Sequence, residues 1–246
     1  MITHTTAIIL KSVDYQESSK IITVLSKAHG KIALIARGSK KPKNKLSGLI
    51  EIGNILDVVY YYKPTRNVQN LTEASIQFSS LNFRRDFQKA SILFATLELV
   101  NQLVHEYEEN ENMFNFLSDF IIWLASYNGI SLTVFCYVQL RCAELMGFNL
   151  TIDKCDSLDE SYFDITHGWI TCKLESELSY KLSLNQTHFL TQALTSKSKK
   201  LFQIWLSAKE VKQLIHHFDA YFKYHIEGYQ DRRSDSIFEQ ILKDSL

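Results

Sequence analysis

The sequence predicts an α+β protein in two parts: a small barrel of five strands, followed by a helical domain that carries a hairpin insert. Two observations lead to this prediction. From Thr3 to Ile76, short runs rich in Ile, Val and Thr alternate with turn residues, as is typical of β-strands. After Ser80, apolar residues recur every three to four positions, which is the spacing of an amphipathic helix. We therefore predict domains at 1–80 and 81–246.

Five strands are predicted in the first domain, at 5–13, 20–26, 30–37, 55–62 and 68–76. No helix-length pattern separates them, and they follow one another within about 75 residues. Such closely spaced strands favour a small closed barrel of the oligonucleotide-binding (OB) fold. An SH3-like barrel fits the same number of strands.

Six helices are predicted in the second domain, at 86–107, 112–127, 131–146, 185–195, 207–228 and 234–242. Between the third and fourth of these helices lies a polar insert at about 150–178. The insert has strand-like residues around Phe163 and Trp169, with His167-Gly168 as the turn between them. We therefore expect a small hairpin on an otherwise helical body.

The composition is that of an ordinary globular protein, because 46% of the 246 residues are hydrophobic and 22% are charged. No apolar run approaches the roughly 20 residues that span a bilayer. The N-terminus lacks the basic start and cleavage site of a secretory signal, so we expect a cytoplasmic protein that does not enter a membrane. The four cysteines form no dense framework, and disulfides are not indicated.

The net charge of zero hides a difference between the two halves of the chain. Residues 1–85 hold 13 Lys and Arg against 5 Asp and Glu, whereas residues 86–246 hold 14 against 22. Such asymmetry favours a polyanionic partner for the basic half. Electrostatic attraction between the two halves is the alternative explanation.

Six cations lie in the acid-free stretch Gly30–Lys45 and are the first candidates for phosphate contacts: Lys31, Arg37, Lys40, Lys41, Lys43 and Lys45. Gly38, Ser39 and Pro42 interrupt the third strand, so most of these side chains are expected on a mobile, solvated loop. A basic loop that only maintains solubility is the simpler alternative.

Aromatic residues accompany these cations on the fourth strand, where Tyr60, Tyr61 and Tyr62 precede Lys63 and Arg66. Alternation along a strand places Tyr60 and Tyr62 on one face and Tyr61 on the other. Exposed aromatic rings beside cations hold single-stranded nucleic acid, so Tyr60 and Tyr62 are candidates for base stacking. One face of the strand could stack bases while the other packs inward, and alternation alone does not decide which face is outward. Four further cations are secondary candidates for phosphate contact: Lys63, Arg66, Arg84 and Arg85.

Catalytic and metal-binding patterns are scarce. The sequence contains no GxxxxGK[ST], GxGxxG, GxSxG or HExxH motif. In the insert, Cys155 and Cys172 would each need a second cysteine three positions later to complete a zinc site, but Leu158 and Glu175 stand there. We therefore expect no cofactor. A zinc bound by Cys155 and Cys172 with His or Asp, and with it a metal-dependent hydrolase, is the alternative.

The order of these features resembles the RecO family of bacterial recombination and repair proteins. The resemblance rests on seven segments of this sequence: Thr5–Leu10, Tyr15–Ile21, His29–Ile32, Ala36–Lys41, Leu71–Ala74, Tyr224-His225 and Arg232–Ser234. Together they extend over nearly the whole chain.

The resemblance implies an N-terminal OB-fold barrel and an α-helical domain with a zinc-finger-like insert, although this sequence has only half of the zinc cysteines. It also implies a function, namely a non-enzymatic mediator of recombinational DNA repair that associates with the nucleoid. Such proteins bind single- and double-stranded DNA, anneal strands and contact the acidic tail of single-strand-binding protein. They act with RecR to load the recombinase RecA. An adaptor that reaches DNA mainly through a partner is the alternative.

The binding site for the acidic tail is not located by the sequence. Basic residues of the helical domain are candidates: Arg141, Lys181, Lys197, Lys199, Lys200, Arg232 and Arg233.

Overall fold

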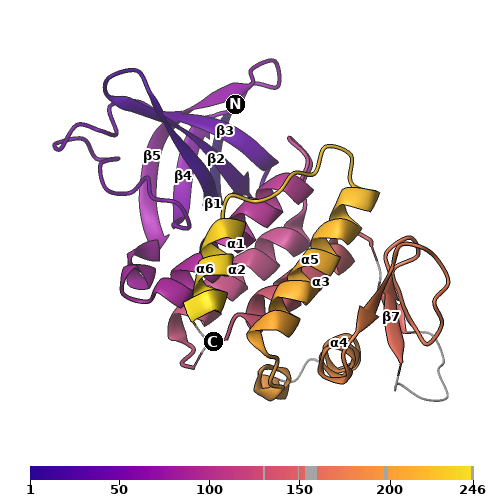
Figure 1. Cartoon of the computed structure of the whole chain (residues 1–246). Coiled ribbons are helices and arrows are strands. Elements are labelled where there is room, and N and C mark those ends of the chain that lie inside the picture. Colours follow the sequence, from indigo (N-terminus) through magenta and orange to yellow (C-terminus); the bar gives the residue numbers. More distant parts are fainter. Residues whose placement is uncertain (130, 149, 153–159, 197–198, 245–246) are drawn as a thin grey trace. The chain divides into compact units, whose positions relative to one another are not determined.

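The computed structural model describes residues 1–129, 131–148, 150–152, 160–196 and 199–244. Its first part is a closed barrel of five strands (Figure 1). These are β1 (Ile2–Tyr15), β2 (Ser19–Ser26), β3 (Gly30–Ala36), β4 (Ile55–Tyr61) and β5 (Val68–Phe78). The order around the barrel is β1-β2-β3-β5-β4, and β4 pairs with β1 to close it. The predicted OB-like barrel and the α+β class are thus confirmed.

Alternating side chains fill the barrel. In β3, for example, Ile32, Leu34 and Ala36 point into the buried core. The alternation changes along β1, because its register with β2 shifts between Ile9 and Lys11. Ala7 and Ile9 face the core before this bulge, whereas Val13 and Tyr15 are exposed after it. The bulge therefore gives the second half of β1 an apolar outer surface.

A short 3-10 helix, η1 (Ser80–Arg85), leads from the barrel to α1 (Phe87–Leu103) and α2 (Glu111–Ser126). Each of these two α-helices begins at a capping side chain. Asp86 accepts a hydrogen bond from the Lys89 N–H at 3.0 Å, and Asn110 accepts one from the Met113 N–H at 2.9 Å. Barrel, α1 and α2 form one compact unit, Met1–Asn128, so the predicted boundary near residue 80 falls inside this unit.

The second compact unit, Gly129–Leu246, is mainly helical. Its helices are α3 (Thr133–Leu145), α4 (Leu184–Thr195), η2 (Lys199–Gln203), α5 (Ala208–His225) and α6 (Asp235–Asp244). The long helix α5 packs against both α3 and α6. The predicted helical domain is therefore present, with helix ends close to the predicted positions.

The insert differs from the expected hairpin. It is a four-stranded sheet in the order β6-β8-β7-β9, made of β6 (Thr151–Ile152), β7 (Ser161–Asp164), β8 (Trp169–Thr171) and β9 (Ser179–Leu182). β7 and β8 are the predicted hairpin. The two outer strands were not predicted. β6 has only two residues, and β9 follows the stretch 173–178, which has no Gly, Pro, Asn or Asp to mark a turn as His167-Gly168 does between β7 and β8.

Among the described residues, no helix combines the length and the apolar character that crossing a bilayer requires.

Candidate nucleic-acid interface

Tyr60 belongs to the interior of the barrel. Its side chain is 0% exposed and packs in the apolar core. The hydroxyl group lies 2.6 Å from Nδ1 of His29, and burial raises the pKa of Tyr60 to about 12. No ring surface is left on which a base could stack. Tyr60 is therefore removed from the predicted stacking residues, because the face that it shares with Tyr62 is the inner one.

Tyr62 directly follows the last residue of β4, is half-buried and packs against the same core. The His29 ring stacks on it, with 3.8 Å between the ring centroids and 12° between the planes. Burial lowers the pKa of His29, while Glu109 opposes this shift. At least one ring face of Tyr62 is thus occupied by a neighbour within the chain, and the stack forms part of the barrel wall.

The exposed aromatic residues of this region are Tyr61 and Tyr15, which sequence reasoning missed as candidates. They are 47% and 40% exposed, respectively. A row of residues paired across the strands crosses the outer surface: Tyr61 of β4, Asn70 of β5, Ile35 of β3, Ile21 of β2 and Val13 of β1. Tyr15 lies two residues beyond Val13. The outer surface thus carries one tyrosine toward each side of a partly apolar strip.

A signal for Tyr61 was present in the sequence. Asp57 is exposed, and alternation places Asp57, Val59 and Tyr61 on the same side of β4. The acidic residue therefore identifies the outer side of the strand. No such signal existed for Tyr15, because the bulge after Ile9 reverses the alternation that the first half of β1 predicts.

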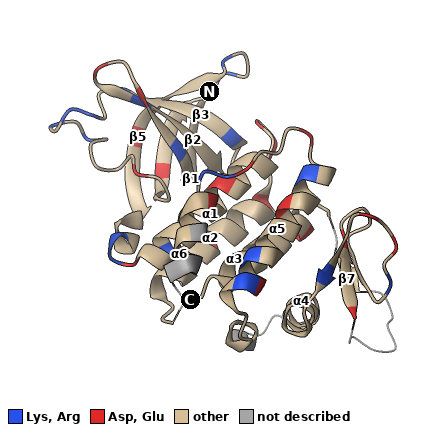
Figure 2. Ribbon diagram, in the orientation of Figure 1, with Lys and Arg blue, Asp and Glu red and all other residues tan. Residues whose placement is uncertain are grey.

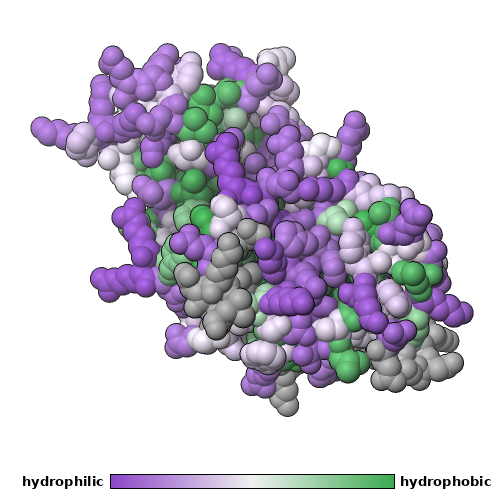
Figure 3. Space-filling model, viewed as in Figure 1, coloured by the Kyte–Doolittle hydropathy of each residue, from purple (hydrophilic) through white to green (hydrophobic). Residues whose placement is uncertain are grey.

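The basic loop after β3 is folded into consecutive turns. The Lys41 N–H donates to the Gly38 carbonyl at 2.9 Å, and the Asn44 N–H donates to the Lys41 carbonyl at 3.0 Å. Leu46 and Ile50 pack into the barrel core and hold the end of the loop. Figure 2 shows Lys and Arg positions along this loop, and Figure 3 shows a largely hydrophilic surface there.

The six cations of this stretch fall into two groups. Lys41, Lys43 and Lys45 are exposed, and their ammonium groups form no ion pair or hydrogen bond within the described part of the chain. The other three, Lys31, Arg37 and Lys40, are engaged inside the chain. Because these side chains already have partners, Lys41, Lys43 and Lys45 are more available to contact phosphate.

Each engaged cation has a different partner. Lys40 pairs with Asp14 at 2.7 Å, and this hydrogen bond lowers the pKa of the Asp14 carboxyl group. Arg37 donates through Nε to Asn70 at 3.3 Å, next to Tyr61 on the outer surface. Lys31 is half-buried, and its Nζ donates to the Asn101 carbonyl at 2.8 Å. Lys31 therefore holds the end of α1 in this structure.

The loop between β4 and β5 carries Lys63 and Arg66, and both side chains are exposed. Below it, Gln69 is 0% exposed and bonds to the loop backbone through its amide group. The parallel pairing of β3 with β5 places this loop beside the first half of β3. The basic loop follows the last residue of β3, so cations lie toward both ends of the strip that holds Tyr61.

Arg84 and Arg85 end η1, and both are exposed. Arg84 pairs with Glu51 at 3.7 Å. In a pair as exposed as this one the attraction is weak, so Arg84 retains much of its ability to attract phosphate.

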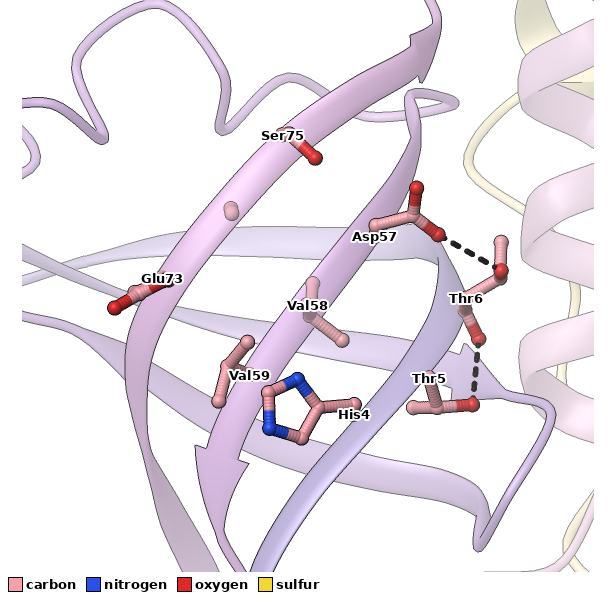
Figure 4. Close-up of a pocket in the computed structure, with 9 residues that line it drawn as sticks. His4, Thr5, Thr6, Asp57, Val58, Val59, Glu73 and Ser75 are labelled. Atoms are coloured by element: carbon pink, nitrogen blue, oxygen red, sulfur yellow. Dashed lines mark hydrogen bonds between the residues drawn. The ribbon is translucent and has the colours of Figure 1, made fainter.

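A hollow of about 440 Å³ lies on another part of the barrel surface, over β1, β4 and β5 (Figure 4). Its charged lining is acidic, with the carboxylates of Asp57 and Glu73. Thr6 donates to Asp57 at 3.0 Å, and Gln77 donates to the same oxygen at 2.7 Å. His4 also lines the hollow. The outer surface of the barrel therefore has a cationic side and an acidic side.

The metal-binding candidates of the insert can be followed only in its described part, 150–152 and 160–178. Cys172 is disulfide-bonded, so the expectation that the chain has no disulfide was wrong. A disulfide-bonded sulfur is not available as a thiolate ligand for zinc. Cys155 lies outside the described residues. Asp164 is buried, and hydrogen bonds from Ser176, Thr166 and Ser179 outweigh its burial and hold its pKa well below the usual range. Over the described ranges, no group of three or more His, Cys, Asp or Glu is arranged to hold a metal ion.

Of the four basic candidates on the second unit whose side chains the structure describes, three form ion pairs within the chain. Arg232 is buried and pairs with Asp219 and Asp235, which ties the start of α6 to α5. Arg141 pairs with Glu144, and Lys181 pairs with Glu160. Arg233 is exposed. Lys197 lies outside the described residues, as do the side chains of Lys199 and Lys200.

A closed OB-like barrel with exposed tyrosines between two basic loops, followed by a helical unit, defines a class: OB-barrel proteins with an appended helical domain. The comparisons with known proteins place the chain more closely. Residues 1–79 match the family model of the recombination protein O N-terminal domain, and residues 84–234 match that of its C-terminal domain. The chain belongs to the RecO family.

Relatives in several bacteria are similar to this chain, two of the three named here over nearly the full length. The DNA repair protein RecO of Chloroherpeton thalassium is 28% identical over 98% of this chain and 100% of that protein. That of Pelodictyon phaeoclathratiforme is 26% identical over 98% of this chain and 99% of its own length. The RecO protein of Chlorobium limicola is 31% identical over 63% of this chain and 59% of its length.

Proposed function

We propose that this protein is a DNA-binding mediator of recombinational DNA repair that works without catalysing a reaction of its own. The observation that carries the proposal is the outer surface of the barrel, where Tyr15 and Tyr61 are exposed between two groups of exposed cations. Aromatic rings in a cationic groove bind single strands with little dependence on sequence, because every base has a face that can stack. The family membership of both parts of the chain agrees with this reading.

The proposed path of the strand follows from the arrangement of these groups. Lys63 and Arg66 contact phosphates at one end, and Tyr61 stacks a base beside Arg37. The strand then crosses β5, β3 and β2 toward Tyr15. Lys41, Lys43 and Lys45 contact phosphates at the other end or on a second strand. Arg84, Arg85 and Lys40 extend the positive field.

Annealing follows from the same electrostatics. Two complementary strands repel each other through their phosphates, and neutralising part of that charge lowers the repulsion. A protein that holds one strand on the barrel and a second strand at the basic loop brings the two together. Binding of single- and double-stranded DNA then has one physical basis, which is contact with the backbone.

The partners that we propose are those implied by the family resemblance. They are RecR, the acidic C-terminal tail of single-strand-binding protein and, indirectly, RecA. The helical unit is the proposed contact for the tail, with exposed Arg233 as one available cation. Such a protein would work in the cytoplasm, at the nucleoid.

A salt titration tests the proposal. About five phosphate contacts on a single strand predict that log affinity falls with log salt at a slope of roughly −3 to −4. The Lys41→Glu/Lys43→Glu variant should weaken binding of a labelled oligonucleotide, slow strand annealing and flatten the slope by about 1.4 for two lost contacts.

The matched control is Lys173→Glu/Lys209→Glu, which reverses two exposed lysines of the second unit. This control should leave binding and slope unchanged. A slope near zero for the unmodified protein contradicts the proposal. Wild-type-like binding by the Lys41→Glu/Lys43→Glu variant would instead favour the adaptor, in which a partner holds the DNA.

A further inference from the structure

The loop between β4 and β5 is held from below by a single buried side chain. Gln69 accepts a hydrogen bond from the Lys63 N–H at 2.9 Å. Its amide nitrogen donates to the Lys63 carbonyl at 3.0 Å and to the Arg66 carbonyl at 2.7 Å. These bonds fix the two ends of the turn, but they reach it only from the barrel side.

The second support comes from the connection between α1 and α2. The Tyr107 hydroxyl lies 3.1 Å from the Arg66 carbonyl and 3.0 Å from the Asn67 carbonyl, so it donates its proton to the end of the same loop. The Tyr107 N–H donates to the Lys31 carbonyl at 3.0 Å. Tyr107 thus connects the helical segment to β3 and to the β4–β5 loop.

The backbone of Tyr107 has an unusual conformation. Its φ angle is +62°, in the left-handed region that residues with side chains rarely adopt. Such a conformation persists only where the surroundings hold it, and its presence points to a local role. Here the residue is held through its N–H on one side and through its hydroxyl on the other.

The neighbours of Tyr107 make its connection rigid. Lys31 Nζ bonds to the Asn101 carbonyl at 2.8 Å near the end of α1. Gly30, with a φ angle of +61°, lies so close to the connection that a Cβ atom there would be 1.8 Å from the Glu108 carbonyl oxygen. The connection therefore has little freedom to shift along β3, and the Tyr107 hydroxyl stays in place over the loop.

We propose that Tyr107 is a positioning residue for the DNA-binding loop, which it holds so that Lys63 and Arg66 point along the path of the strand. The inference rests on the proposed function. It assigns to the first two helices a share in DNA binding, although Tyr107 itself touches no DNA. The binding surface then depends on a residue that lies outside the barrel in the sequence.

The test compares four proteins: the unmodified chain, Tyr107→Phe, Lys63→Ala/Arg66→Ala, and the variant with all three changes. Tyr107→Phe removes only the hydroxyl group. Without the hydrogen bond from this hydroxyl, the β4–β5 loop is less well ordered. Binding of a labelled thymidine oligonucleotide should therefore weaken about threefold to tenfold. The salt slope should flatten by up to about 1.4, because two contacts are loosened.

The decisive comparison is the double-mutant cycle. If Tyr107 acts through the loop, then Tyr107→Phe has no further effect once Lys63 and Arg66 are alanine. The control is Tyr127→Phe, which removes a hydroxyl at the far end of α2 and should leave binding unchanged. Amide hydrogen exchange of Lys63 and Arg66 should become faster in Tyr107→Phe but not in Tyr127→Phe.

Two results would overturn the inference and leave the proposed function intact. One is an equal loss of affinity from Tyr107→Phe with and without the two loop cations. The other is unchanged binding by Tyr107→Phe while Lys41→Glu/Lys43→Glu binds weakly. Salt-independent binding of the unmodified chain would instead contradict the proposed function itself.

Discussion

The cationic side of the barrel and its acidic hollow are parts of one closed sheet, yet they present opposite surfaces. On the cationic side, Tyr61 and Arg37 lie next to Asn70, and exposed lysines follow in the loop after β3. Over β1, β4 and β5, the hollow is lined by Asp57 and Glu73. Since Asp57 and Tyr61 belong to the same strand, the surface changes its character within four residues.

The difference bears on the proposed binding of a polyanion by a barrel with a modest surplus of positive charge. Electrostatic attraction between exposed charges fades over about 8–10 Å at physiological salt. A single small barrel can therefore keep an attractive and a repulsive surface apart. The proposed function therefore predicts that the acidic hollow keeps the DNA strand on the cationic side.

The largest expected effect separates the inner from the outer tyrosine. Tyr60→Ala should lower the free energy of unfolding by about 3–5 kcal/mol, because it opens a cavity in the core. Tyr61→Ala should change it by less than about 0.5 kcal/mol, since its side chain is exposed. Urea denaturation of both variants measures this difference.

In oligonucleotide binding, Tyr61→Ala should have the direct effect, because Tyr61 is the proposed stacking residue and Tyr60 is not. Loss of one stacked base costs about 1–3 kcal/mol of binding free energy, so Tyr61→Ala should weaken oligonucleotide binding markedly. A Tyr61→Phe variant, which keeps the ring, serves as the control and should bind normally. Normal binding by Tyr61→Ala would show that the strand avoids this part of the barrel.

A smaller effect is the pH dependence of stability that His29 causes. Burial depresses the pKa of His29, which faces Tyr60, Tyr62 and Glu109, so the folded state binds fewer protons there than the unfolded state. The contribution of neutral His29 to the free energy of unfolding is complete above its pKa in the unfolded chain, about 6.5. It is lost as the pH falls below that value toward the pKa of His29 in the folded protein.

Denaturation at pH 7.5 and pH 5.5 tests this sign. His29→Phe keeps a ring on Tyr62 but cannot be protonated, so it should reduce the loss of stability between the two pH values. His4→Phe, in the acidic hollow, is the matched control. An unchanged pH dependence in His29→Phe would mean that other groups account for the acid sensitivity.

The smallest expected effect is in the hollow itself. Glu73→Lys adds a cation on the acidic side, outside the proposed path of the strand. Because screening limits its reach, oligonucleotide affinity should change by no more than about twofold. A gain in affinity comparable to the loss in Lys41→Glu/Lys43→Glu would place the DNA over the hollow and remove the distinction between the two sides.

The sequence contained most of the fold but only part of the site. The period of two in β3 and the helical spacing after Ser80 predicted elements that the structure has. The charge of Asp57 could also have shown that Tyr61 faces outward and Tyr60 inward. The orientation of Tyr15 was not, because a bulge leaves no mark in an apolar run such as that of Ala7–Leu10.

Contacts between distant residues could not be predicted. The charge of Lys31 suggested phosphate, but its partner is the carbonyl of a residue 70 positions away. Arg232 likewise resembles a surface cation in the sequence and is buried by ion pairs that only the packing of α6 on α5 creates. Residue type gives the charge, whereas the tertiary structure decides where that charge is used.

The support that Tyr107 gives to the β4–β5 loop also has a consequence for synthesis of the protein. Tyr107 is 40 residues after Asn67, whose carbonyl it contacts. At a translation rate of about 5–20 residues per second, the ribosome needs roughly 2–8 s to make that interval. During this time a nascent barrel can close its strands and use Gln69, but the loop lacks its second support. The barrel can thus complete its fold before its binding surface is complete.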